Sequence, residues 1–228
     1  MKAVVEPTTE ISLPMARWAI ATSAAVLLLL ASLHMLSPEF NPSWRMVSEY
    51  ANGQYGWVLS LMFASWAVSS WVLVFMIRSQ VKTVAGRIGL LFLIAAGVGE
   101  AMASVFDINH PLHGLASIIG VGSLPIAAML ISISLGRTQA WSFAKKALLW
   151  TAKLTWISVV LLAASFVLMI VTFTQSGAPL PAEPPTTLPP GVIGLVGWAN
   201  RFLIVAYCVW VIAVAWQAIK VHERNRPA

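Results

Sequence analysis

The chain has 228 residues, of which 59% are hydrophobic and 10% are charged, and its formal net charge is +6. Soluble domains carry about a quarter charged residues, so this composition excludes an ordinary soluble domain and indicates a polytopic membrane protein. Most of the positive charge lies at the ends of apolar runs on one side, as membrane orientation requires, so it does not indicate nucleic-acid binding. The single cysteine, Cys208, excludes an intrachain disulfide.

Six apolar runs follow one another, each close to the roughly 20 residues that cross a bilayer as a helix. We therefore predict an all-α bundle of six transmembrane helices, forming a single domain over residues 17–219. A cytoplasmic tail is predicted over residues 1–16 and a basic cytoplasmic tail over residues 220–228. The predicted membrane helices are residues 18–35, 56–77, 88–106, 112–135, 148–173 and 192–218.

The first connection, residues 37–55, contains the signals of a short helix. Asn41 can cap a helix whose first position is Pro42, and Gly53 can end it. Trp44 falls on the apolar face of this segment. We predict a short interfacial helix that lies on the membrane with its aromatic side down.

The third predicted helix carries an acid, Glu100, within an apolar run. An acid in hydrocarbon is costly and is expected to face protein or a polar cavity. The small residues Gly97 and Ala101 stand four apart in the same helix, a spacing that lets another helix approach closely. We therefore predict that Glu100 faces the interior of the bundle.

Lysine and arginine are concentrated in the two tails and in the second and fourth connections, whereas the other three connections hold only Arg45. Because basic loops stay in the cytoplasm, we predict that both termini are cytoplasmic. The fifth connection, residues 174–190, holds six prolines and no basic residue. It is predicted to be extended and irregular.

This orientation collects polar residues at the outer face. Counting 1.5 Å per residue along each helix, Glu100 and Arg201 lie at similar depth below that face. Either charge alone would be costly there, so we predict that the two lie close together. They form a structural ion pair or line a polar cavity that opens outward. The other outer polar residues are His34, Glu39, Arg45, Ser48, Glu49, Tyr50, Asp107, His110, His113 and Asn200.

The pair His110 and His113 straddles a turn and a proline. With Asp107 or Glu49 it could bind a divalent metal, since imidazole and carboxylate are suitable ligands. The alternative is that Asp107 and His113 cap helix ends through hydrogen bonds. Haem ligation by His34 and His113 is supported only by the prediction that both histidines lie on the outer side of the membrane. We expect no cofactor, with a divalent metal as the alternative.

Two short motifs resemble a known membrane family. They are Val47-Ser48-Glu49, which lies between Ser37-Pro38 and Gln54-Tyr55-Gly56-Trp57, and Leu112-His113-Gly114 at the start of the fourth helix. The chain resembles the family catalogued as domain of unknown function 998, whose members have a similar number of membrane helices. The resemblance implies a multi-pass protein of the bacterial cytoplasmic (inner) membrane, with an outward cluster containing Ser48, Glu49 and His113. It implies no established reaction.

The first functional hypothesis is a non-enzymatic one. The protein would bind a membrane lipid, a small apolar molecule or a partner protein in an outward-facing polar pocket. Glu49, Glu100 and Arg201 would set the polarity of that pocket, with Trp44 and Tyr50 at its rim. The other expected binding residues are Ser48, Asp107 and Asn200.

The second hypothesis is a membrane-embedded enzyme that acts on a lipid or another apolar substrate. His110 and His113 would hold a metal or move protons, and Glu49 or Glu100 would act as general base. A proton-coupled carrier that uses Glu100 ranks last, because the inner halves of the predicted helices are almost wholly apolar.

Overall fold

The computed structural model describes residues 11–179 and 187–225, and all regular structure within them is helical. Its long helices are α1 (Leu13–Leu36), α2 (Gly56–Ile77), α3 (Val84–Val105), α4 (His113–Gly136), α5 (Lys145–Gln175) and α6 (Val196–Arg224). Two short 3-10 helices, η1 (Val47–Asn52) and η2 (Gln139–Ala144), lie in connections. Each of the six long helices is long and apolar enough to span a bilayer, which confirms the predicted number of spans.

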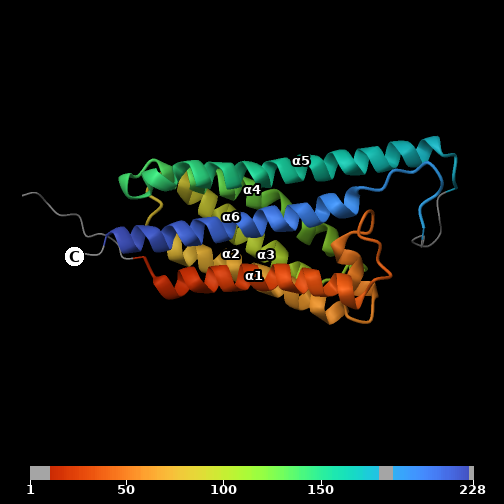
Figure 1. Cartoon of the computed structure of the whole chain (residues 1–228), viewed down its shortest axis with the longest axis horizontal. Coiled ribbons are helices and arrows are strands. Elements are labelled where there is room, and N and C mark those ends of the chain that lie inside the picture. The colour runs from red at the N-terminus through yellow and green to blue at the C-terminus, as the bar shows by residue number, and fades with distance from the viewer. Residues whose placement is uncertain (1–10, 180–186, 226–228) are drawn as a thin grey trace, which may run out of the picture.

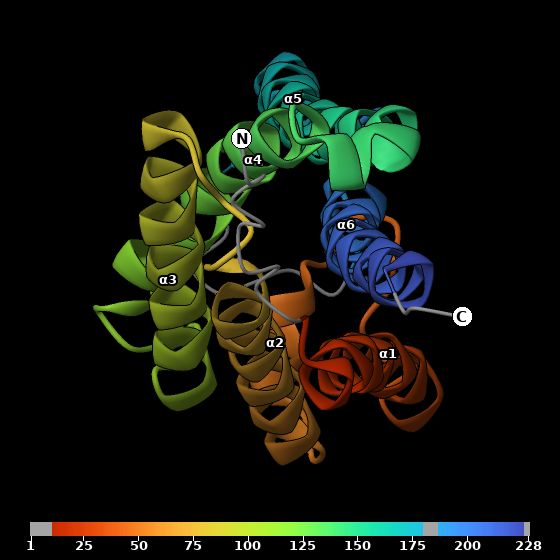
Figure 2. The same cartoon turned by 90° about the vertical axis from the view of Figure 1, so that its left-hand side faces the viewer.

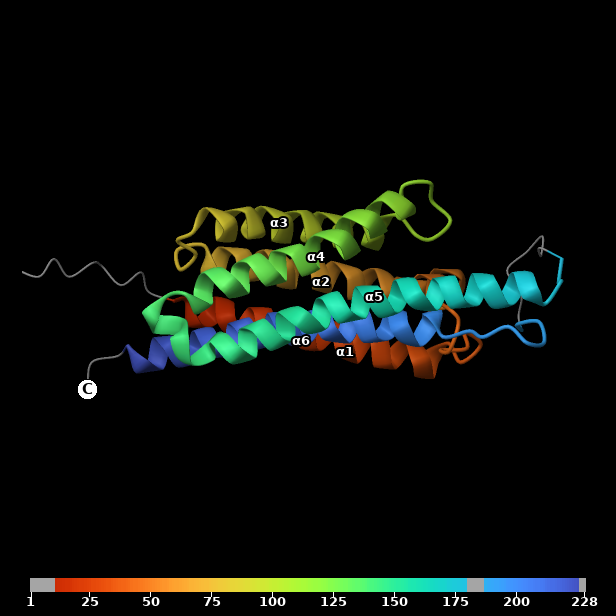
Figure 3. The ribbon, with the colours of Figure 1, turned by 90° about the horizontal axis from the view of Figure 1, so that it is seen from above.

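The helices form an elongated bundle in which each packs against its neighbours in the sequence, and α6 closes the ring by packing against α1 (Figure 2). The start of α1 and the end of α6 lie at the same end of the bundle, which we call the terminal end (Figure 1). The opposite end, which we call the distal end, holds the α1–α2, α3–α4 and α5–α6 connections. There α5 extends beyond the other helices (Figure 3).

Large apolar side chains cover the outside of the bundle as well as its interior. Leu28, Leu91 and Val160, for example, are mostly exposed. In water such a surface would be unfavourable, but hydrocarbon solvates it as well as protein does. Because the helices are apolar on all sides, as membrane spans are, periodicity in the sequence says little about which face points inward.

Several helix boundaries differ from those predicted. Helix α1 begins at Leu13 and takes in Pro14, which is tolerated in a first turn because its missing N–H would be unpaired there anyway. Helix α6 begins at Val196 and continues to Arg224, beyond the predicted end. Residues 1–10 of the predicted tail, 180–186 of the proline-rich connection and 226–228 of the basic tail lie outside the described residues.

The first connection does not form a helix over the whole stretch from Pro42 to Asn52 that its capping signals predict. The side-chain oxygen of Asn41 accepts hydrogen bonds from the backbone N–H and the hydroxyl of Ser43, so it makes a turn rather than starting a helix. Regular structure begins only at Val47, as η1, whose Val47, Ser48 and Tyr50 are buried. The segment therefore packs against the helix bundle.

Candidate functional site

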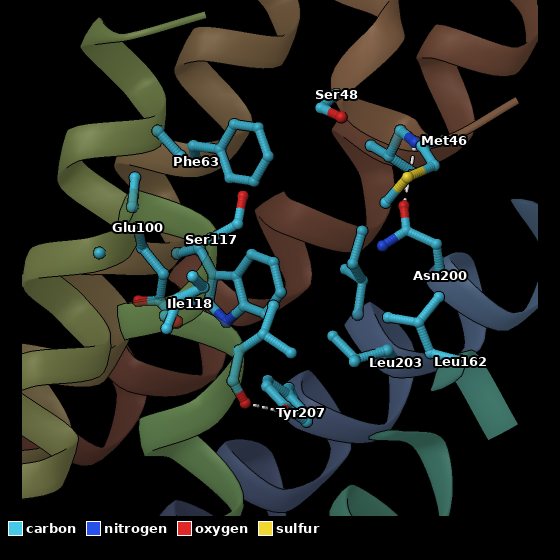
Figure 4. Close-up of a pocket in the computed structure, with 18 of the residues that line it drawn as sticks. Met46, Ser48, Phe63, Glu100, Ser117, Ile118, Leu162, Asn200, Leu203 and Tyr207 are labelled. Atoms are coloured by element: carbon cyan, nitrogen blue, oxygen red, sulfur yellow. Dashed lines mark hydrogen bonds between the residues drawn. The ribbon is translucent and has the colours of Figure 1, made fainter. Parts of the chain in front are cut away.

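A cavity of about 490 Å³ lies in the distal half of the bundle. In Figure 4, Glu100 of α3 and Ser117 and Ile118 of α4 lie on one side of this cavity, and Asn200 and Leu203 of α6 lie on the other. The lining also includes residues 46–48 of the first connection, side chains of α2 and side chains of α5. Its volume falls within the range of roughly 300–1,000 Å³ that is usual for small-molecule sites.

Helices α3 and α4 cross very closely beside this cavity, and Gly99 makes the crossing possible. A Cβ atom on Gly99 would lie only 2.7 Å from the carbonyl oxygen of Ala116 and from the Cα of Gly120. Only glycine fits at such a distance, because the neighbouring atoms are backbone and cannot rotate away. The crossing places the next residue, Glu100, at the wall of the cavity.

Glu100 lines the cavity and is only 4% exposed. The hydroxyl of Ser70 on α2 donates a hydrogen bond to its Oε2 atom at 2.8 Å. The other carboxyl oxygen, Oε1, is buried and has no hydrogen-bond partner among the described residues. An unpartnered buried polar atom costs free energy and is rare in folded proteins.

Trp66 of α2 also lines the cavity, and its side chain is 5% exposed. Its ring stacks on Phe63 with 6.3 Å between ring centroids and meets Tyr207 edge-on at 5.9 Å. The hydroxyl of Tyr207 donates to the carbonyl of Val121 at 2.7 Å. By contrast, the Nε1 atom of Trp66 is buried without a hydrogen-bond partner in the part of the chain that the structure describes.

The predicted pairing of Glu100 with Arg201 is wrong. Arg201 is 4% exposed and binds other groups: its Nε donates to Nε2 of His34 at 2.7 Å, and its Nη2 donates to the hydroxyl of Tyr50 at 3.1 Å. Its Nη1 donates to the backbone carbonyls of residues 45 and 197. These bonds hold α6 to α1 and to the first connection. The buried charge of Arg201 is therefore stabilised by uncharged hydrogen-bond acceptors and not by the carboxyl group of Glu100.

Glu49 does not line the cavity, and its carboxyl group instead makes contacts within the first connection. Its Oε2 pairs with Arg45 at 2.9 Å, and its Oε1 accepts from the backbone N–H of Met46 at 2.6 Å. Beside it, Oδ1 of Asn200 accepts from the backbone N–H of Val47 at 2.9 Å. These bonds fasten the first connection over the distal end, and Ser48 is brought into the cavity wall.

His113 lines the cavity, and its Nδ1 donates to the carbonyl of Phe106 at 2.8 Å, which joins the start of α4 to the end of α3. His110 is exposed and stacks on Phe106 with 4.4 Å between ring centroids. Asp107 accepts from the backbone N–H of Asn109 at 2.9 Å. These are the helix-capping and turn contacts that were the alternative to a metal site. Among the described residues, no three His, Cys, Asp or Glu side chains come together in a way that could hold a metal ion.

The structure thus divides the residues that the sequence singled out. Ser48, Glu100, His113 and Asn200 line the cavity, whereas Trp44, Glu49, Tyr50, Asp107, His110 and Arg201 are not part of its lining. Sequence reasoning did not select the aromatic residues Phe63, Trp66 and Tyr207. One signal was present for Trp66, since it stands in the middle of its span and not at an end, where tryptophan usually anchors a helix at the interface.

Comparisons with known proteins identify the family. A search of curated proteins and a search of solved structures each found no match. A family model described as "Protein of unknown function (DUF998)" matches residues 19–217, which is most of the chain and all of the six-helix domain except its ends. The chain is therefore an integral membrane protein with six candidate spans that belongs to the DUF998 family.

Proposed function

We propose that this protein binds an apolar small molecule, drawn from the surrounding bilayer, in the cavity between α2, α3, α4, α5 and α6. The observation that carries the proposal is the cavity itself: about 490 Å³ with walls made mainly of aliphatic and aromatic side chains. Apolar walls with a few convergent polar groups are the usual composition of a small-molecule site.

The cavity has a wall that is also part of the outer surface of the bundle. Ile118 of α4 lines the cavity although its side chain is 73% exposed, and Gly122, one turn further along, is exposed and lines it too. On α5, Leu162 and Phe166 face the same space. We propose that a molecule dissolved in the bilayer enters the cavity from this exposed side of α4, without crossing water.

The polar groups of the cavity are spread along it, and this favours binding over catalysis. The backbone nitrogen of Glu100 lies 3.7 Å from the Cβ position of Gly120, and His113 precedes Gly120 by seven residues on α4. At 1.5 Å per residue, His113 is about 10 Å from Glu100 along the helix axis. An acid and a base that act on one substrate atom must both come within hydrogen-bond reach of it, so this axial separation supports a binding site more than an acid–base pair.

We further propose that both termini are cytoplasmic and that the cavity lies in the outer half of a bacterial cytoplasmic membrane. Basic residues support this orientation: the α2–α3 and α4–α5 connections at the terminal end carry several, whereas Arg45 is the basic residue of the described connections at the distal end. Basic connections are retained on the cytoplasmic side.

The test of binding is a cavity-blocking variant with a matched control. Gly122 and Gly114 are both exposed residues of α4, and a Cβ atom on either would meet nothing within 4 Å. Only Gly122 lines the cavity. Gly122→Phe should therefore fill the cavity, and Gly114→Phe should leave it open, while both should fold.

Each protein would be purified in native membrane discs, and its retained molecules would be extracted and identified by mass spectrometry. We expect an apolar molecule to accompany the native protein and Gly114→Phe and to be depleted from Gly122→Phe. Equal content in all three proteins would contradict the proposal. Loss of a co-purifying protein partner from Gly122→Phe, with unchanged small molecules, would favour a partner-binding role instead.

A further inference from the structure

Four residues of the cavity lining carry polar side chains near the distal end: Ser48 of η1, His113 and Ser117 of α4, and Asn200 of α6. The backbone N–H of Val47 donates to Oδ1 of Asn200 at 2.9 Å, so Ser48, the next residue, lies beside Asn200. His113 begins α4, and Ser117 stands about one turn further along the same face. Asn200 is the fifth residue of α6. Because α4 and α6 both begin at the distal end, all four belong to the distal part of the cavity.

Each of these residues has a polar atom that a bound molecule can reach. The two serine hydroxyls, Nδ2 of Asn200 and Nε2 of His113 have no hydrogen-bond partner among the described residues, and none of them is enclosed by protein. Nδ2 of Asn200 donates, and Nε2 of His113 accepts because Nδ1 donates to the carbonyl of Phe106. In Figure 4 the amide nitrogen of Asn200 and the hydroxyl of Ser117 point into the space between α4 and α6. The distal part therefore offers both donors and acceptors.

Further from the distal end the cavity is apolar. Tyr207 follows Asn200 by seven residues on α6, about 10 Å along the axis, and its ring meets that of Trp66 with 5.9 Å between centroids. The hydroxyl of Tyr207 donates to a backbone carbonyl of α4, and Oε2 of Glu100 accepts from Ser70. Oε1 of Glu100 and Nε1 of Trp66 are enclosed by protein, so a molecule in the cavity does not reach them. The other walls are aliphatic or aromatic and include Phe63, Leu162, Phe166, Leu203 and Ile204.

The distal part of the cavity has no charged partner for a ligand. Among the described residues, no lysine, arginine or aspartate lines the cavity. Arg45 and Glu49 pair with each other at 2.9 Å and, like Arg201, lie outside the lining. Residues 46–48 of the first connection form part of the wall at this end. A charged group placed there would lose water without gaining an opposite charge, which is costly.

We infer that the cavity binds a single-chain lipid with an uncharged head group that both donates and accepts hydrogen bonds, such as a monoacylglycerol. The head lies at the distal end, between Ser48 and Asn200 on one side and His113 and Ser117 on the other, and the chain runs inward toward Trp66. At about 30 Å³ for each water-sized group, about 490 Å³ holds roughly 16 such groups, which suits one chain with its head. This inference rests on the proposed binding function and specifies its ligand.

The experiment uses three probes with the same chain length, a bromine at the far end of the chain and different head groups. They are ω-bromododecanoylglycerol, methyl ω-bromododecanoate and ω-bromododecyl phosphate. The full-length protein is reconstituted in lipid nanodiscs, and quenching of tryptophan fluorescence by the bromine is titrated. All three probes also quench tryptophans that face lipid. The quenching that Gly122→Phe loses and Gly114→Phe keeps is the share that arises in the cavity, and most of it should disappear in Trp66→Phe.

We expect the monoacylglycerol to bind the cavity about tenfold more tightly than the phosphate and about three- to tenfold more tightly than the methyl ester, which cannot donate. The double variant Ser48→Ala/Ser117→Ala removes two hydroxyls that have no partner among the described residues, and it should lower the preference for the monoacylglycerol over the ester. Ser65→Ala/Ser104→Ala is the matched control. Both of these hydroxyls bond within their own helices and lie outside the lining, so the preference should be unchanged.

Other outcomes separate the two proposals. Equal binding of the monoacylglycerol and the methyl ester, with both lost in Gly122→Phe, would overturn the inference while leaving the binding function intact. Tightest binding of the phosphate would also overturn it, and cavity quenching that survives Trp66→Phe would contradict the orientation of the chain. Quenching by all three probes that is insensitive to Gly122→Phe would contradict the binding function itself.

Discussion

Arg201 of α6 donates from its Nε atom to Nε2 of His34 on α1 at a distance of 2.7 Å. Because Nε2 accepts this bond, the proton of the imidazole is on Nδ1, which donates to the carbonyl of Leu30 at 2.7 Å. The ring is thereby fixed in one tautomer. This contact, with the bond from Arg201 to Tyr50, closes the ring of helices at the distal end.

We expect Arg201→Met to destabilise the protein by about 2 to 4 kcal/mol, because it leaves several buried acceptors without a donor. Thermal unfolding in detergent, followed by circular dichroism, measures the change. Arg137→Met is the control, since Arg137 is exposed beyond the end of α4, and it should unfold near the native temperature. Equal unfolding temperatures for the two variants would show that Arg201 does not hold α6 in place.

Gly99→Ala is expected to lower stability by about 1 to 3 kcal/mol, the usual cost of overpacking a tight contact. The added Cβ would collide with the backbone of α4, which cannot move without separating the two helices. Gly120→Ala, on the other side of the same crossing, is the matched control. Its Cβ would lie 3.7 Å from the nearest atom, an ordinary contact, so its unfolding temperature should not fall. A drop of similar size in both variants would contradict the close approach of Gly99 to α4.

Ser70→Ala removes the hydrogen bond to Oε2 of Glu100 and leaves that carboxyl group without a partner among the described residues. We expect a loss of about 1 to 3 kcal/mol, because a buried polar group is desolvated without compensation. Adding Glu100→Leu should recover most of the loss, since an apolar side chain has nothing left to pair. A double-mutant cycle of unfolding temperatures measures the coupling. Strictly additive effects would mean that the two residues act independently.

The proposed orientation predicts opposite accessibility for the two ends of α3. Cys208 is buried, so a cysteine introduced at an exposed site can be labelled selectively. Asn109→Cys, after α3, should react with a membrane-impermeant maleimide in intact spheroplasts. Lys82→Cys, before α3, should react only after lysis. The reverse pattern would place the cavity in the cytoplasmic half of the membrane.

The membrane character of the chain and the number of its helices follow from the sequence alone. Hydrocarbon imposes the same requirement on every span separately: enough apolar length, and all backbone groups paired within the helix. Six runs met that requirement, and six helices are present in the described part of the chain. The prediction that Glu100 faces the interior is also confirmed, since the residue is buried. The sequence allowed this prediction because small residues mark the helix face that packs against another helix.

The partners of Glu100 and Arg201 were decided only by the tertiary structure. Depth in the membrane can be counted along a helix, and the count rightly suggested that both residues lie in the distal half. Which neighbour a side chain meets depends on how each helix is rotated about its axis and on how closely it crosses the next one. Gly99 allows α3 to approach α4 closely, and the neighbouring Glu100 accepts a hydrogen bond from Ser70. Arg201 meets His34 of α1 and Tyr50 of the first connection. Helices that are apolar on every face carry no periodic signal of that rotation, so packing alone settled it.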